Sequence, residues 1–100
     1  MTQRRRVVIT GMGIVSPLGC DLGLFWHQLS RGESGIRPIT SFDTSPFHSS
    51  LAGEVNDFDP TDFIQPKKAR RMGRVSQFAV AAALMAGRDA MLDMDQEDRD

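Results

Sequence analysis

The sequence predicts an α/β fold, because a strand of the kind found inside sheets precedes two segments with helical periodicity. The strand contains Val7-Val8-Ile9, a continuous β-branched run that is typical of a strand covered on both faces. Residues 22–29 and 66–92 repeat apolar side chains every three or four positions, as amphipathic helices do. The chain has 100 residues, which is enough for one domain or for part of one.

Composition and charge exclude several classes of protein. The formal net charge is −1, so we expect no general attraction to nucleic acid or to an anionic membrane. The apolar run after Arg4-Arg5-Arg6 ends at Thr10, which is too short for a signal peptide or a membrane span. Cys20 is the single cysteine, so no intrachain disulfide can form and a reducing compartment is favoured. We therefore expect a cytoplasmic protein.

The first strand is expected to cover residues 6–15 and to lead into a turn at residues 16–19. Gly11 and Gly13 permit another backbone to approach closely. Two glycines after a strand also occur in dinucleotide-binding loops, but a third glycine and an immediately following helix are missing here. A packing or turn role is therefore preferred, and a nucleotide-binding α/β domain stays as an alternative.

A short helix is expected after the turn. Asp21 is a suitable N-cap, and Gly32 is suitable as the residue that ends the helix. The apolar stripe between them comprises Leu22, Phe25, Trp26 and Leu29, of which Phe25 and Trp26 are expected in the core or in a dimer interface. Residues 33–53 predict a largely irregular connection with a short strand near residues 51–55, and residues 61–64 predict a single helical turn.

The second helix is expected to run from Pro66, a favourable first helical residue, to about Leu92. Its inward-facing stripe comprises Met72, Val75, Phe78, Ala79, Ala82 and Met85. Residues 93–100 are rich in aspartate, and we expect them to form an acidic, solvated and frayed tail.

Five cations lie between residues 67 and 74. The face that they share on one continuous helix comprises Lys67, Arg70, Arg71 and Arg74. Positive charge at a helix N-terminus opposes the helix dipole, so solvation alone explains the cluster poorly. Clustered cations steer an acidic partner and fix its orientation. We therefore expect a docking surface for an acidic partner, with a merely solvated helix face as the alternative.

The other reactive side chains do not predict a site. Cys20 has no histidine nearby in the sequence that would activate it as a nucleophile, so we expect an ordinary thiol. His27 and His48 have no cysteine or carboxylate at metal-ligand spacing, so no metal site is predicted.

Several stretches, in order and with similar spacing, resemble the N-terminal part of the β-ketoacyl-[acyl-carrier-protein] synthases, most closely the type II enzymes of fatty-acid elongation. The first matching stretches are Arg5 to Gly13, Ser16-Pro17-Leu18-Gly19, Trp26 and Gly32 to Ile36. The later ones are Ile39, Phe42-Asp43, Ala52 to Val55, Asp57 to Pro60, Lys67, Arg70-Arg71-Met72 and Gln77-Phe78-Ala79. Each stretch alone is weakly specific, but the ordered set covers nearly the whole chain.

The resemblance implies that residues 1–100 are the N-terminal portion of a thiolase-like fold, an incomplete α/β domain that is homodimeric when full length. It implies an acyltransferase of fatty-acid biosynthesis that condenses an acyl group with malonyl-carrier protein. The family's nucleophilic cysteine and two histidines lie beyond residue 100, so no catalytic residue is assigned. No metal or organic cofactor is implied beyond the phosphopantetheine arm of the carrier.

On the same resemblance, Lys67, Arg70 and Arg71 match part of the surface that docks the acidic acyl carrier protein, and Arg74 joins them through the shared helix face. Gly73 departs from the family, which often has aspartate there. A non-catalytic protein that binds the carrier or a synthase, and the N-terminal piece of a polyketide ketosynthase, remain as alternatives. The chain alone is expected to be inactive and to fold poorly, because a central strand without sheet neighbours leaves backbone groups unpaired.

Overall fold

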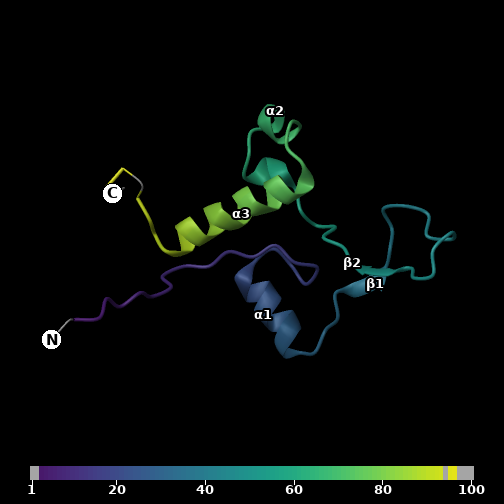
Figure 1. Ribbon diagram of the computed structural model, residues 1–100, viewed down its shortest axis with the longest axis horizontal. Helices are drawn as coiled ribbons and strands as arrows, with labels where there is room; N and C mark the ends of the chain where they lie inside the picture. Colours follow the sequence, from purple (N-terminus) through teal and green to yellow (C-terminus); the bar gives the residue numbers. More distant parts are fainter. Residues whose placement is uncertain (1–2, 94, 97–100) are drawn as a thin grey trace.

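The computed structural model describes residues 3–93, 95 and 96 of the chain (Figure 1). Its elements are α1 (Leu22–Ser30), β1 (Ile36–Pro38), β2 (Leu51–Gly53), the 3₁₀ helix η1 (Pro60–Asp62), α2 (Pro66–Ala69) and α3 (Arg74–Asp89). The molecule is elongated, with extents of 62 × 37 × 24 Å and a radius of gyration of 17.8 Å. A compact domain of this length has a radius of gyration of about 13 Å, so the chain is far from spherical.

The exposed surface is also large. The accessible area is 8605 Å² for a chain of 11.1 kDa, whereas a compact monomer of this mass exposes about 5,700 Å². The buried hydrophobic residues of the described part are Phe58, Ile64, Ala69 and Ala81. All four lie between residues 57 and 89, so the core belongs to the unit formed by η1, α2 and α3.

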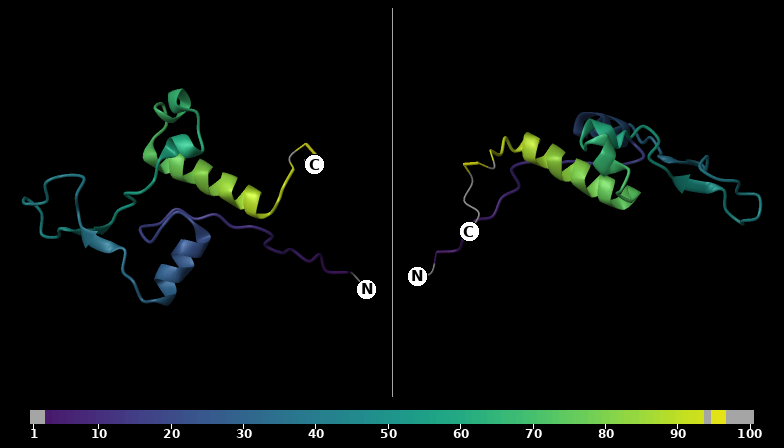
Figure 2. Two further views of the ribbon diagram at one scale, coloured as in Figure 1. Left: turned by 180° about the vertical axis from the view of Figure 1, so that it is seen from behind. Right: turned by 90° about the horizontal axis from the view of Figure 1, so that it is seen from above.

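Residues 3–15 run as an extended segment and form no hydrogen-bonded strand among the described residues (Figures 1 and 2). The side chains of Val7, Val8 and Ile9 are 94%, 68% and 82% exposed. The predicted central strand is therefore wrong as a sheet element of this chain. The physical reason is the absence of a partner, since the sheet in the described part consists of β1 and β2 alone.

The two glycines of this segment pack closely against the backbone of α3, as the sequence predicted from their lack of side chains. A Cβ atom on Gly11 would collide with the carbonyl oxygen of Ala86, and one on Gly13 would collide with that of Ala82. The Met12 amide donates a hydrogen bond of 2.9 Å to the carboxylate of Asp89. The segment is thus held along α3 by small residues on both sides and by one polar contact.

The turn and α1 confirm the sequence prediction in detail. The Gly19 amide donates to the Ser16 carbonyl at 3.1 Å, which closes the turn. The Asp21 carboxylate accepts from the Leu24 amide at 2.9 Å, and Gly32 follows the helix with a φ of 75°. Trp26, however, is 66% exposed. A core role for Trp26 is therefore wrong, and a role in a dimer interface stays a prediction.

The connection after α1 contains a two-stranded hairpin, of which only β2 was predicted. The antiparallel register pairs Ile36 with Gly53 and Pro38 with Leu51. The β1 strand escaped prediction because it has three residues, ends in proline and shows no alternation. The carboxylate of Glu54 accepts hydrogen bonds from the amides and hydroxyls of Thr40 and Ser41, at 2.7 to 3.3 Å. These bonds tie the first residues of the hairpin loop to the residue that directly follows β2.

The predicted helix over 66–92 is two helices. The α2 helix ends at Ala69, and α3 begins at Arg74. Gly73 is the N-cap residue of α3, and it has no side chain that could accept a hydrogen bond from the first amides of the helix. Glycine is a poor helix former, so the chain turns here rather than continuing. The inward face also differs from the predicted stripe, since Val75 is 78% exposed whereas Ala81 is fully buried.

Two further expectations concern a membrane-spanning segment and the C-terminal tail. No helix among the described residues is long and apolar enough to cross a membrane. Asp93 is exposed, as an acidic tail predicts. The frayed tail was expected over residues 93–100, and residues 94 and 97–100 lie outside the described part.

Candidate functional site

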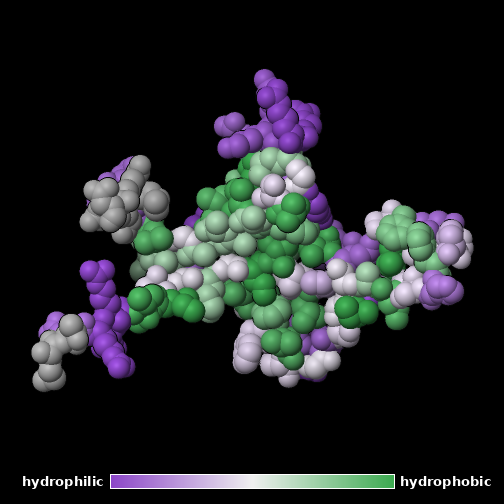
Figure 3. Space-filling view, viewed as in Figure 1, coloured by the Kyte–Doolittle hydropathy of each residue, from purple (hydrophilic) through white to green (hydrophobic). Residues whose placement is uncertain are grey.

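The predicted docking cations lie at the end of the molecule formed by α2 and the following turn. Lys67, Lys68, Arg70 and Arg71, here called the basic corner, are all exposed. In the space-filling view, hydrophilic residues gather at this end, where Figure 1 places α2 (Figure 3). Hydrophobic residues dominate the surface below it.

The backbone explains why the basic corner faces outward. The Arg70 amide donates to the Pro66 carbonyl, the Arg71 amide to Lys68 and the Met72 amide to Ala69, each at 3.1 Å. Helical geometry therefore continues past Ala69, whose side chain is 3% exposed and faces inward. At about 100° per residue, Lys67 and Arg71 project on the side opposite Ala69, with Lys68 and Arg70 beside them. Three of the four predicted docking residues thus share one surface.

Arg74, the fourth predicted residue, is placed differently. Its guanidinium donates a hydrogen bond of 2.8 Å to the Val55 carbonyl. The same group lies 5.2 Å from the ring centre of Phe58 and 4.9 Å from that of Phe78. The prediction that Arg74 shares one helix face with the basic corner is wrong, because the chain breaks at Gly73. The contacts of Arg74 join the preceding loop to α3 instead.

An aromatic cluster supports this end of the molecule. The rings of Phe58 and Phe78 meet edge to face at 5.1 Å, and Phe58 stacks on Phe63 at 6.1 Å. Asp59 caps η1, since its carboxylate accepts from the amide and hydroxyl of Thr61 at 2.9 and 2.6 Å. These two hydrogen bonds, the one from the hydroxyl first, lower the pKa of Asp59. The cluster gives α2 a defined surface on which to pack.

Gln77 is a residue of this site that the sequence reasoning missed. Its side-chain nitrogen donates to the Ala69 carbonyl at 2.9 Å and to the Met72 carbonyl at 3.4 Å. The side chain is half-buried between α3 and the end of α2. The sequence contained no signal for it, because Gln77 lies on the opposite side of the helix from the centre of the predicted apolar stripe.

The charges of the basic corner have no acidic counterpart in the described residues. The one ion pair found there joins Arg31 and Glu33, at 3.8 Å. Four cations on one small surface, without an ion-pair partner among the described residues, create a positive potential that attracts and orients an acidic partner. The arrangement can bind an anionic surface, and it holds no nucleophile or general base.

The other candidate residues are not brought together. Cys20 is half-buried, His48 is exposed, and the His27 ring lies 3.4 Å from the guanidinium of Arg31. Among the described residues, no three histidine, cysteine or acidic side chains are grouped so as to hold a metal ion.

The glycine segment does not form a phosphate loop. Gly11 and Gly13 face the backbone of α3, and the Asp89 carboxylate already accepts the hydrogen bond of the Met12 amide. An anion at this place would meet both a steric block and a like charge. The geometry therefore disfavours the nucleotide-binding alternative.

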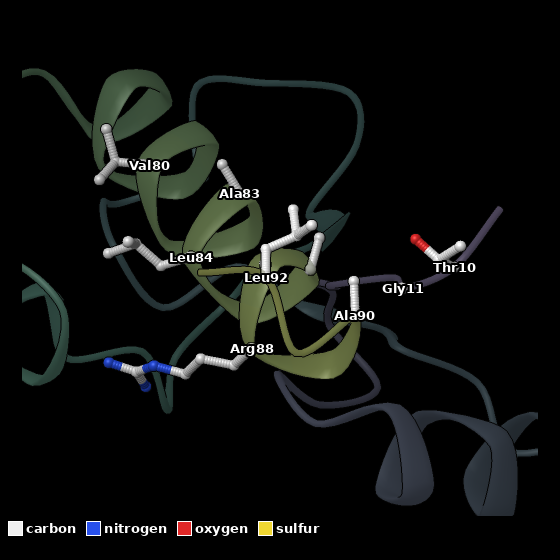
Figure 4. A pocket seen from close by; sticks show the side chains of 10 residues that line it. Thr10, Gly11, Val80, Ala83, Leu84, Arg88, Ala90 and Leu92 are labelled. Carbon is white, nitrogen blue, oxygen red and sulfur yellow. The ribbon is translucent and has the colours of Figure 1, made fainter. Parts of the chain in front are cut away.

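A groove of about 690 Å³ lies between residues 10–11 and the C-terminal half of α3 (Figure 4). Its lining is mainly apolar and includes Val80, Leu84 and Leu92, with Arg88 at one edge. A second apolar groove, of about 530 Å³, lies between residues 12–14 and α1 and is lined in part by Trp26. The residues that line these two grooves include no cysteine, histidine or acidic side chain.

The comparisons with known proteins agree on one family. Residues 4–100 match the model of the β-ketoacyl synthase, N-terminal domain. The chain is 46% identical over its 100 residues to 3-oxoacyl-[acyl-carrier-protein] synthase 2 of Staphylococcus aureus strain COL, of which it spans 24%. It is 44% identical over 94 residues to the synthase 2 of Coxiella burnetii, of which it spans 23%. The chain thus spans about a quarter of the length of these curated relatives.

A solved structure is similar as well. The structure described as the ishigamide ketosynthase/chain length factor superposes with a TM-score of 0.84 and 47% sequence identity. The match covers 93% of this chain and 23% of that one. The elongated path of the chain therefore resembles one segment of a larger folded protein.

Proposed function

Because this chain belongs to the β-ketoacyl synthase family, we propose that it is the N-terminal segment of a 3-oxoacyl-[acyl-carrier-protein] synthase of fatty-acid elongation. The family match over residues 4–100 confirms the predicted resemblance. The superposition on a ketosynthase confirms the predicted partial α/β fold of the thiolase-like kind. The family is one of condensing acyltransferases.

In this proposal a full-length synthase takes an acyl group from a carrier protein and joins it to malonyl-carrier protein with loss of carbon dioxide. The reacting cysteine and histidines are supplied by sequence beyond residue 100, so the described chain contributes structure and recognition. The synthase works as a cytoplasmic homodimer and uses no metal or organic cofactor other than the carrier's phosphopantetheine arm.

The contribution that we assign to this chain is carrier docking by the basic corner. The observation that carries the proposal is the exposure of Lys67, Arg70 and Arg71 on one surface, where none of them forms an ion pair with a described carboxylate. An acidic carrier would be steered toward this surface and held in one orientation. Arg74 takes part indirectly, since its guanidinium is engaged by Val55 and two rings.

A double charge reversal tests docking. In the native protein, at the length that its source cells make, Lys67→Glu with Arg70→Glu should weaken binding of the acyl carrier protein about tenfold or more at low salt. The matched control is Arg4→Glu with Arg5→Glu, which makes the same charge change at exposed residues of the N-terminal segment. The control should change affinity less than about twofold. Equal losses of affinity in both variants would show that only the net charge of the protein matters, and this result would contradict the docking proposal.

A polyketide ketosynthase is the second candidate, and the similarity to a ketosynthase/chain length factor favours it. Identities of 46% to the Staphylococcus aureus synthase and 47% to that structure do not separate the two. Turnover with the carrier protein of fatty-acid synthesis, compared with a polyketide carrier from the same cell, decides between them. Carrier binding without condensation, by a native chain of this length, would instead support a non-catalytic binding protein.

A further inference from the structure

We propose that Gln77 is a positioning residue for carrier docking, which fixes the basic corner from α3 without itself contacting the carrier. This inference rests on the docking function proposed above. It concerns how the exposed cations keep one arrangement although α2 has only four residues. A helix of that length is not stable by itself, so its orientation must come from tertiary contacts.

The first step of the argument is the weakness of the covalent connection. The basic corner joins α3 through Gly73, which has no side chain to cap α3 and whose carbonyl accepts only the first hydrogen bond of that helix, from the Gln77 amide at 3.1 Å. A Cβ atom at this position would meet nothing within 4 Å, so no packing restrains it. Glycine allows many backbone conformations at low cost. The connection would therefore act as a hinge if nothing else held it.

The second step is the geometry of the amide. The primary amide of glutamine has two N–H donors, and the two acceptors here are carbonyl oxygens of Ala69 and Met72. The amide nitrogen must face them, because the opposite orientation would place oxygen against oxygen. The Ala69 carbonyl also accepts from the Met72 amide at 3.1 Å, so both of its lone pairs are used. One half-buried side chain thereby closes the end of α2.

The third step connects the tie to recognition. Ala69 and Met72 enclose Arg70 and Arg71 in the sequence, so fixing their carbonyls fixes the backbone that carries these two cations. A surface ordered before binding loses less conformational entropy when the partner arrives. Removal of the tie should leave the charges present but spread over several arrangements. Carrier affinity and its dependence on salt should then both fall.

The test is Gln77→Met in the native protein, which keeps the length of the side chain and removes both donors. The control is Gln28→Met, the same change at a half-buried glutamine of α1. We expect Gln77→Met to raise the Kd for acyl carrier protein about three- to tenfold, as loss of one or two hydrogen bonds allows. The slope of log Kd against log salt should become shallower, whereas Gln28→Met should change neither quantity.

A second pair of variants guards against misfolding. Gln77→Asn keeps the amide but is one methylene too short to reach Ala69, and Gln28→Asn is its control. Thermal unfolding of each variant shows whether the fold persists. We expect Gln77→Asn to weaken binding in the same direction as Gln77→Met while the protein stays folded.

The outcomes separate the two proposals. If the Lys67→Glu and Arg70→Glu double variant weakens binding but both Gln77 variants bind with unchanged Kd and salt slope, the positioning role is wrong and docking stands. A loss of affinity at Gln77 with an unchanged salt slope would also overturn the positioning role, since the cations would still act together. If the double charge reversal itself has no effect, both proposals are overturned.

Discussion

Residues 57–89 bury apolar side chains against one another, whereas residues 3–15 leave several of theirs exposed. The first region contains every buried hydrophobic residue of the described part, together with a capped 3₁₀ helix and an aromatic cluster. The second region exposes a β-branched run that is typical of a sheet interior. The helical unit finds its partners within about thirty residues, whereas a central strand needs neighbours from elsewhere.

The difference shows which of the two regions finds its packing partners within the described residues and which does not. Helix caps, ring contacts and the Gln77 amide are formed by residues close in sequence or in the same unit. The extended segment makes its contacts to α3 through Gly11, Met12 and Gly13, and the apolar residues before them contact little. The relatives are about four times as long, and their additional sequence is where we expect the missing strand neighbours.

The largest effect should come from the aromatic cluster. Phe58→Ala removes a ring that is 7% exposed and that contacts Phe63, Phe78 and Arg74. A loss of about 3–5 kcal/mol is expected for a buried phenylalanine, which should abolish protection of the α3 amides in hydrogen exchange. Val8→Ala in the isolated 100-residue chain should leave that protection unchanged, because Val8 is exposed. Equal effects of the two changes would remove the contrast between the regions.

A smaller effect is expected where the two regions meet. Gly13→Ala places a methyl group against the Ala82 carbonyl and should destabilise the contact between the segment and α3 by about 1–3 kcal/mol. Gly87→Ala is the matched control, since its Cβ atom meets nothing within 4 Å in the last turns of α3. That change should stabilise the helix by about 0.5–1 kcal/mol. Thermal unfolding of both variants gives the comparison, and a stabilising Gly13→Ala would contradict the observed packing.

The smallest effect concerns pH and the hairpin, which lies outside both regions. Hydrogen bonds from the Ser41 hydroxyl and the Thr40 amide lower the pKa of Glu54. A carboxylate with a lowered pKa stabilises the folded state above its ordinary pKa, and this contribution is lost as the pH falls through the folded-state value. The protection factors of the Thr40 and Ser41 amides, which are exchange rates corrected for their intrinsic pH dependence, should therefore fall on acidification. Glu54→Gln should remove that pH dependence, and protection factors that stay constant with pH in both proteins would contradict the assigned hydrogen bonds.

Prediction from the sequence succeeded where the signal was local. Asp21, Gly19 and Gly32 have the positions that capping and turn chemistry indicate, because these preferences depend on a few adjacent residues. The close approach at Gly11 and Gly13 was foreseen from the missing side chains, although its partner, α3, was not. The family was predicted correctly because ordered motifs persist even where the elements between them are irregular.

The failures have physical causes that periodicity cannot reveal. The apolar pattern continued through Gly73, so it predicted one helix where the chain bends into two. The same error assigned Arg74 to the docking face, although its guanidinium serves Val55 and the aromatic cluster. Gly73 also leaves the first amides of α3 without a side-chain acceptor, which an aspartate at this N-cap position could supply. Gln77 was missed because a tie to two carbonyls depends on tertiary geometry.

The intact mass of the native protein from its source cells tests most directly whether this chain is the opening segment of a synthase. A mass about four times the 11.1 kDa of the chain is predicted, in line with a chain that spans 24% of its Staphylococcus aureus relative. The additional sequence would then supply the strand neighbours and the reacting cysteine and histidines. A native mass near 11.1 kDa would contradict the proposed condensing activity and leave carrier binding as the function to test.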